Sequence, residues 1–281
     1  MGRLYVLGTD TDVGKTQVAC EILRLARRRG HTVLPFKPAL SGYRPGGNDS
    51  TALLHAAGMS PDHAAAITPF RYATPIAPGL AEDAEHFTTN RPPSTTPLRR
   101  AEARLLALER TLAPALTLLE GAGGIWVPMP GGTWQPEWVR RLSPTCVLVA
   151  RPGLGTINHT VLSLRALMDA GLHPVGFVLC ATTVRAHAQR DTCRVLEQHT
   201  ALPYLGTLAY RRVSTRTSPS SQSTSLTECD GHDWLDARFW DALELGTRAG
   251  HGLFPDAKSF KNRVEDVDSD GTELVPPDDL G

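Results

Sequence analysis

The sequence has no excess of charge of either sign. Its 281 residues include 29 lysines and arginines and 29 aspartates and glutamates, so the formal net charge is zero. Without a positive field over the whole molecule, there is little electrostatic attraction for nucleic acid or for an anionic membrane surface. We therefore expect neither nucleic acid nor a membrane as a partner.

Paired cysteines and long apolar runs are also missing. The five cysteines are widely spaced and form no C-x-x-C pair, which predicts free thiols in a reducing compartment. The first apolar run, Leu4–Leu7, is too short for a signal peptide, and no later run is long enough to span a membrane. The sequence therefore predicts a soluble, cytoplasmic protein, and its hydrophobic content of 41% allows a full core.

Short apolar runs alternate with amphipathic stretches along most of the chain. The apolar runs are Leu4–Leu7, Val33–Phe36, Leu116–Leu119, Val147–Ala150, Val175–Leu179 and the weaker Tyr204–Leu208. The amphipathic stretches are Thr16–Arg29, Pro97–Leu112, Ile157–Ala170 and Ala186–Gln198. Continuous apolar runs are typical of strands buried on both faces of a parallel sheet, and their alternation with helices indicates βαβ units. We predict an α/β fold with a doubly wound, mostly parallel sheet that binds ligands at the carboxyl ends of its strands.

The composition changes after Val213. Residues 214–227 are rich in serine and threonine, as is typical of a flexible linker. Asp233–Leu245 has apolar residues near helical spacing and predicts a short amphipathic helix, whereas the acidic tail from Glu265 is expected to be disordered. We therefore predict a catalytic domain over residues 1–213 and an appendage over residues 214–281.

The stretch GTDTDVGKT, residues 8–16, predicts a phosphate-binding loop between a strand and a helix. Five residues separate Gly8 from Gly14, one more than in the common pattern G-x-x-x-x-G-K-[ST]. Backbone N–H groups at the start of the helix can still hold phosphates, Lys15 can reach them, and the Thr16 hydroxyl can bind Mg²⁺. The alternative is an ordinary turn with a chance Gly-Lys-Thr, which the strand–loop–helix context disfavours.

Charged residues also follow two other predicted strands. Lys37 follows the second strand, where it either stabilises charge on a transferring group or merely extends from the sheet edge. Glu120 follows the third strand and precedes GAGG, so with Thr16 it can supply oxygen ligands for Mg²⁺. Asp49 precedes a helical stretch and could simply cap it. Gly153–Asn158 is either an ordinary loop or a helix start that holds a substrate carboxylate.

Several motifs together resemble the ATP-dependent dethiobiotin synthetase family. GTDTDVGKT looks like the phosphate loop of that family, and further similarities follow in order along about residues 1–210. They are KPALSG at Lys37–Gly42, Asn48-Asp49, FRYATPIAP at Phe70–Pro78, EGAGG at Glu120–Gly124 and LGTINH at Leu154–His159. The resemblance implies a fold of the P-loop NTPase class.

The resemblance also implies a reaction. It is the formation of dethiobiotin, in biotin synthesis, from diaminopelargonic acid, CO₂ and ATP, with Mg²⁺ as cofactor and a homodimer as the active form. One substrate amine would capture CO₂ as a carbamate, ATP would phosphorylate the carbamate, and the second amine would close the ring. Such chemistry depends on positioning and charge neutralisation more than on acid–base groups.

Individual residues receive roles from the same resemblance. The implied catalytic residues are Lys15 and Lys37, and the implied Mg²⁺ ligands are Thr16, Asp49 and Glu120. The implied ATP-binding residues are Asp12, Val13, Gly14, Lys15, Thr16, Gln17, Asp49, Glu120, Gly121, Ala122 and Gly123. Ser41 is expected to bind the carbamate, and Asn158 is expected near the substrate carboxylate, reached across the dimer interface.

Three features depart from the family pattern. Cys180-Ala181 stands where many members have an asparagine that reads adenine, so use of other nucleoside triphosphates is a hypothesis. Arg190 replaces an aromatic residue that can cross the dimer interface, and the linker after Val213 replaces a loop that encloses the base.

Two alternative functions remain open at this point. One is a partitioning-type ATPase switch of related fold, which the absence of a lysine in Gly8–Asp12 disfavours. The other is a related P-loop ligase that acts on another small carboxylic acid, and an inactive relative is a further possibility.

Overall fold

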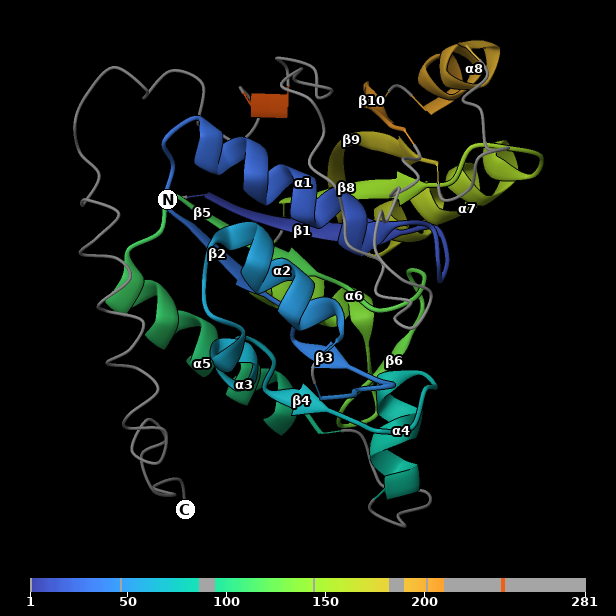
Figure 1. Ribbon diagram of the computed structural model, residues 1–281. Helices are drawn as coiled ribbons and strands as arrows, with labels where there is room; N and C mark the ends of the chain where they lie inside the picture. The colour runs from blue at the N-terminus through green and yellow to red at the C-terminus, as the bar shows by residue number, and fades with distance from the viewer. Residues whose placement is uncertain are drawn as a thin grey trace, which may run out of the picture.

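A computed structural model describes residues 2–45, 47–85, 94–143, 145–181, 190–200, 202–209 and 239–240 (Figure 1). A six-stranded sheet forms its centre. In chain order the strands are β1 (Gly2–Gly8), β2 (Val33–Phe36), β5 (Leu116–Glu120), β8 (Thr145–Ala150), β9 (His173–Cys180) and β10 (Tyr204–Leu208). Their spatial order is β10-β9-β8-β1-β5-β2, and all neighbouring pairs are parallel. Each strand contains one of the predicted apolar runs.

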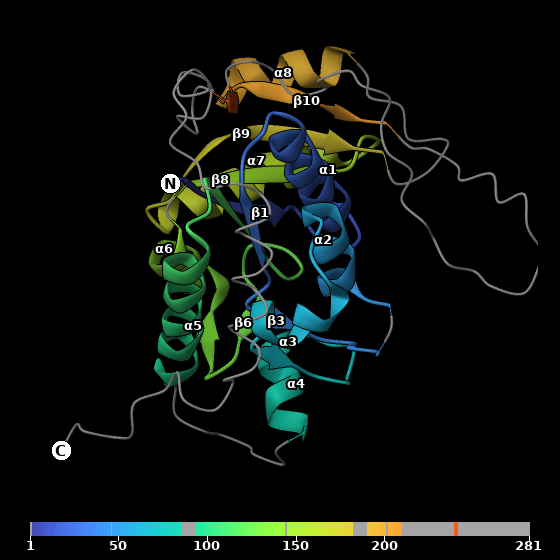
Figure 2. The same cartoon turned by 60° about the vertical axis from the view of Figure 1, so that its left-hand side comes forward.

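Helices cover both faces of this sheet. The larger ones are α1 (Lys15–Arg28), α2 (Asp49–Ala57), α5 (Thr96–Leu112), α6 (Gln135–Leu142), α7 (Thr156–Asp169) and α8 (Arg190–Thr200). Figure 2 shows α1 and α2 on one side of the sheet and α5 and α6 on the other. Each side has its own core, because alternate residues of a strand point to opposite faces: Leu4 and Val6 pack with α1, whereas Tyr5 and Leu7 pack on the other side. The predicted doubly wound α/β fold is confirmed.

Smaller elements connect the larger ones. They are β3 (Ala39–Leu40), η1 (Pro61–His63), α3 (Ala64–Ile67), β4 (Phe70–Arg71), α4 (Pro78–Glu85), β6 (Pro128–Met129) and β7 (Thr133–Trp134). β3 pairs with β4 in parallel, and β6 pairs with β7 as an antiparallel hairpin. These short strands were not predicted, because two-residue strands leave no periodic pattern in the sequence.

Part of the predicted appendage packs on the core. Phe239 and Trp240 are helical and almost fully buried, with 0% and 2% of their surface exposed. Their rings meet edge to face with centroids 5.0 Å apart, and the Arg29 guanidinium lies 4.1 Å from the Trp240 ring centroid, beside α1 (Figure 1). The predicted linker, the rest of the predicted helix and the acidic tail lie outside the described residues, so the domain boundary stays a prediction.

Two further sequence expectations concern cysteines and membrane spans. The four described cysteines (Cys20, Cys146, Cys180 and Cys193) are buried and form no disulfide among the described residues, whereas Cys229 lies outside them. Within the part of the chain that the structure describes, we find no helix with the length and apolar character needed to cross a membrane.

Candidate active site

The stretch GTDTDVGKT forms a loop between β1 and α1. Asp12 and Gly14 adopt positive φ angles of 57° and 92°, in the left-handed region that favours glycine. A Cβ atom on Gly14 would also collide with Cys180 Sγ at the end of β9. The longer loop therefore turns through two left-handed residues, and its last glycine lets α1 pack closely against β9.

Lys15 lies within this loop and faces its interior. Its Nζ donates a hydrogen bond to the carbonyl oxygen of Asp10 at 2.8 Å. Burial lowers the pKa of Lys15 to about 8, with a further contribution from the positive charge of Lys37. An anion beside an ammonium group with so little solvation would stabilise its positive charge. Lys15 is therefore well suited to bind phosphate.

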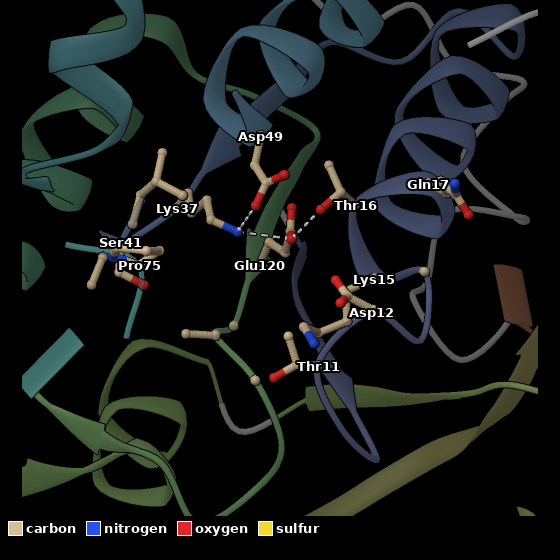
Figure 3. A pocket seen from close by; sticks show the side chains of 16 residues that line it. Thr11, Asp12, Lys15, Thr16, Gln17, Lys37, Ser41, Asp49, Pro75 and Glu120 are labelled. Carbon is tan, nitrogen blue, oxygen red and sulfur yellow. Dashed lines mark hydrogen bonds and ion pairs between the residues drawn. The ribbon is translucent and has the colours of Figure 1, made fainter. Parts of the chain in front are cut away.

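Four side chains from different elements meet beyond the loop (Figure 3). Lys37 Nζ lies 2.8 Å from Glu120 Oε1 and 2.8 Å from Asp49 Oδ2, and Thr16 Oγ1 donates to Glu120 Oε1 at 2.6 Å. Lys37 follows β2, Glu120 ends β5, and Thr16 lies at the start of α1. The order β1-β5-β2 brings them together, because parallel strands end at the same edge of the sheet.

Burial and the neighbouring charges together shift the pKa values of the ionisable groups in this cluster. Burial alone would lower the pKa of Lys37, but Glu120 and Asp49 outweigh burial and raise it above its ordinary value. Burial opposes ionisation of Asp49 as well, yet Lys37 brings its pKa below the ordinary value. Burial raises the pKa of Glu120, with Lys37 acting in the opposite direction. Lys37 is therefore a charged ammonium held between two acidic groups.

The oxygen atoms of this cluster fit a magnesium ion. Glu120 Oε2 is buried and has no hydrogen-bond partner among the described residues. Together with the Asp49 carboxylate and the Thr16 hydroxyl, it provides hard oxygen donors for Mg²⁺, which usually takes its remaining ligands from phosphates and water. The residues that are present therefore fit the implied ion.

Asp49 is not the cap of α2. The N-cap is Asn48, whose side chain accepts a hydrogen bond from Thr51 N at 3.2 Å, while Thr51 Oγ1 accepts one from Asn48 N at 3.0 Å. This capping box satisfies the start of the helix. The Asp49 carboxylate instead points to Lys37, and its side chain is 41% exposed, so a ligand can reach it.

One cavity of about 570 Å³ connects the loop with this cluster. Its volume is in the range typical of small-molecule sites. The predicted residues that line it are Asp12, Gly14, Lys15, Thr16, Gln17, Lys37, Ser41, Asp49, Glu120, Gly121, Ala122 and Gly123 (Figure 3). Thr11, Ala39, Leu40 and Pro75 also line it and were not among the predicted site residues. Pro75 belongs to FRYATPIAP, so the similarity at that motif was a usable signal.

Two predicted residues do not line the cavity. Val13 is 1% exposed and packs in the core on the α1 side, so its side chain does not face a ligand there. Asn158 is exposed in the first turn of α7. Within a single chain the structure does not bring Asn158 to the other site residues.

Comparison with known proteins identifies the family. Residues 2–218 match a family model described as an AAA domain. The chain is 39% identical over 184 residues to the ATP-dependent dethiobiotin synthetase BioD of Anaeromyxobacter sp. (strain K), covering 65% of this chain and 78% of that relative. It is 32% identical over 229 residues to the ATP-dependent dethiobiotin synthetase BioD of Xanthomonas campestris pv. campestris (strain 8004), covering 80% and 95%. The chain belongs to the dethiobiotin synthetase family.

Membership in the dethiobiotin synthetase family confirms the resemblance carried by the sequence motifs. The strand–loop–helix unit of β1 and α1 agrees with the predicted P-loop class of fold. The relatives are named as synthetases, which counts against a partitioning-type ATPase switch. The family model ends at residue 218, so Phe239 and Trp240 pack on this dethiobiotin synthetase fold from outside the matched region.

Proposed function

We propose that this chain is an ATP-dependent ligase that forms dethiobiotin from diaminopelargonic acid and CO₂. Family membership supplies the class of reaction. The observation that carries the proposal is the convergence of Lys15, Thr16, Lys37, Asp49 and Glu120 on one cavity beside the phosphate loop. Two cations and two carboxylates at this point suit a reaction between two anions, a carbamate and a nucleoside triphosphate.

The loop would hold the phosphates of ATP. Backbone N–H groups at the start of α1 and the ammonium of Lys15 attract the negative charge, and the helix dipole adds to this attraction. Asp12, Val13, Gly14 and Gln17 would contribute loop contacts, with Val13 acting through its backbone. Thr16, Asp49 and Glu120 would hold Mg²⁺, which when bound neutralises charge on the phosphates.

The chemistry we propose has two bond-forming stages after the carbamate has formed. A carbamate oxygen attacks the γ-phosphorus of ATP, which releases ADP and leaves a carbamoyl phosphate. The second amine then attacks the carbonyl carbon, closing the cyclic urea and releasing phosphate, while the proton lost by nitrogen passes to solvent. Lys37 would stabilise the transferring phosphoryl group and the developing oxyanion with its charge, and its place in the cavity beside Asp49 and Glu120 supports this role.

Substrate binding would use the wall of the cavity that contains Ser41. Its hydroxyl would bind the carbamate, and Asp12 would lie near the reacting amine.

We further propose a homodimer in which Asn158 of one subunit receives the carboxylate of a substrate bound in the other. Exposed apolar side chains at the start of α7, Leu154 and Ile157, support a covered surface there. The described cysteines form no disulfide with one another, which fits the reducing cytoplasm.

A mass-spectrometric assay with purified protein, diaminopelargonic acid, bicarbonate and Mg-ATP tests the proposed reaction. We expect dethiobiotin and ADP in equal amounts, and neither product from the Lys15→Ala variant. ATP hydrolysis that is independent of diaminopelargonic acid, without dethiobiotin, would contradict the proposal. Dethiobiotin absent with this acid but ADP release stimulated by a different amino acid or carboxylic acid would favour a related ligase.

A further inference from the structure

One buried side chain holds the loop Gly121–Gly124, which follows Glu120 at the cavity. This side chain belongs to Gln135, the first residue of α6, which is 1% exposed. Its Oε1 accepts a hydrogen bond from Ala122 N at 2.7 Å, and its Nε2 donates one to Gly124 O at 2.6 Å. Gln135 thus uses both ends of its amide to satisfy a backbone donor and a backbone acceptor of the same loop.

The loop is packed between Gln135 and the phosphate loop. A Cβ atom on Gly121 would lie 2.8 Å from Gln135 Oε1, which is closer than real Cβ contacts allow. On the other side, a Cβ atom on Gly124 would lie 3.4 Å from the carbonyl oxygen of Thr9. Gly121 therefore lets the backbone approach the Gln135 amide closely, whereas Gly124 lies at an ordinary contact distance from the phosphate loop.

We propose that Gln135 is a positioning residue for nucleotide binding and ligation. It fixes the Gly121–Gly124 backbone against the phosphate loop and thereby keeps Glu120 aligned with Thr16 and Lys37. Gln135 is not among the residues that line the cavity, so it acts through the loop and not on the substrate. The ligation part of this inference rests on the proposed function, whereas the nucleotide part does not.

A purely structural role for Gln135 is the competing explanation, because losing a buried amide destabilises any fold. A matched control is available two residues earlier. Thr133 is 4% exposed, and its Oγ1 accepts a hydrogen bond from Trp138 Nε1 at 2.8 Å. Thr133→Val removes this buried hydrogen bond and also the one that Thr133 Oγ1 donates to Pro130 O at 3.2 Å, and it changes none of the hydrogen bonds to Gly121–Gly124.

The experiment compares Gln135→Met, Gln135→Asn and Thr133→Val with the wild-type chain well below their melting temperatures. Calorimetry gives the Kd for ADP, and the mass-spectrometric assay gives kcat and KM per folded protein. Because small misplacements of reacting groups cost up to about 100-fold in rate, we expect Gln135→Met to lower kcat by about 10–100-fold. We also expect it to weaken ADP binding several-fold, while Thr133→Val keeps both quantities within about twofold.

Gln135→Asn keeps the amide but shortens the side chain by one carbon. Its kcat and its affinity for ADP should therefore lie between those of the wild type and those of Gln135→Met. It also carries the test if the methionine variant fails to fold. A loss of ADP affinity or kcat that exceeds the loss in Thr133→Val supports the positioning role. Values equal to those of Thr133→Val for both Gln135 variants would overturn it. If wild type makes no dethiobiotin, the proposed function fails, and the ADP affinities still decide the role of Gln135.

Discussion

At the scale of single residues, the candidate site contains charged side chains that are buried. Lys37 is 4% exposed at its side chain and holds two acidic groups at 2.8 Å. Lys15 is also buried, and its pKa is lowered to about 8 as a result. These two cations differ in their partners: Lys37 is paired with carboxylates, whereas Lys15 contacts a backbone carbonyl. We therefore expect different consequences when each is changed.

Replacing Lys37 should remove most turnover and leave the fold intact. In Lys37→Ala no cation lies between Asp49 and Glu120, and charge on the transferring group loses its stabilisation. Loss of one such group commonly costs about 10²–10³-fold in kcat. The dethiobiotin assay and the far-ultraviolet circular dichroism spectrum measure the two effects, with the exposed Arg28→Ala as the control. Wild-type kcat in Lys37→Ala would show that the catalytic assignment is wrong.

Nucleotide affinity should fall as the pH rises through about 8. The lowered pKa means that Lys15 without ligand loses its proton above that value, and a neutral amine does not attract phosphate. For a pKa of about 8, the charged fraction drops about tenfold between pH 7 and pH 9, so ADP should bind about tenfold more weakly at pH 9. Calorimetry with ADP in metal-free buffer measures this change. Lys15→Ala should bind weakly at both pH values; a pH-independent wild-type affinity would disprove the prediction.

At the scale of elements, the two ends of α1 have different roles. Its N-terminus lies at the proposed phosphate site, and Arg29, just past its C-terminus, stacks on Trp240. A helix of 14 residues is about 21 Å long, so the two ends lie far apart. The aromatic contact therefore belongs to the core and not to the active site.

Truncating Trp240 should lower stability with little effect on catalysis. Trp240→Ala removes a side chain that is 2% exposed, and such core truncations cost about 3–5 kcal/mol. Urea denaturation of the full chain measures this loss, and kcat should stay within about twofold at 25 °C. Met168→Ala, at a side chain that is 56% exposed, is the control and should change stability little. Wild-type stability in Trp240→Ala would mean that the aromatic pair does not pack as described.

At the scale of the whole molecule, the proposed homodimer decides whether Asn158 can act. Leu154 is fully exposed and Ile157 is 42% exposed on the surface that carries Asn158. Leu154→Asp should therefore shift the protein from dimer to monomer in light-scattering measurements and raise the KM for diaminopelargonic acid about tenfold or more. Leu80→Asp, at another exposed leucine, on α4, is the control. A monomeric wild-type protein with full activity would contradict both the dimer and the role of Asn158.

Sequence patterns were most informative where a local signal and burial coincide. The six strands follow from continuous apolar runs, and Lys15, Thr16, Lys37 and Glu120 follow from motifs at strand ends. The sequence could not show that Asn48, and not Asp49, caps α2, because both residue types cap helices well. The hydrogen bonds of Gln135 left no signal either, since they join α6 to a loop eleven or more residues earlier.

By itself, the sequence determined the family, the parallel α/β sheet and the phosphate loop, because apolar periodicity and glycine-rich turns act over a few neighbouring residues. Only the tertiary structure decided that Lys37 is paired with Asp49 and Glu120, that Gln135 clamps the Gly121–Gly124 loop, and that Trp240 completes the α1 core. These contacts join residues far apart in the chain, and their geometry depends on the order in which strands assemble. No local pattern encodes that order.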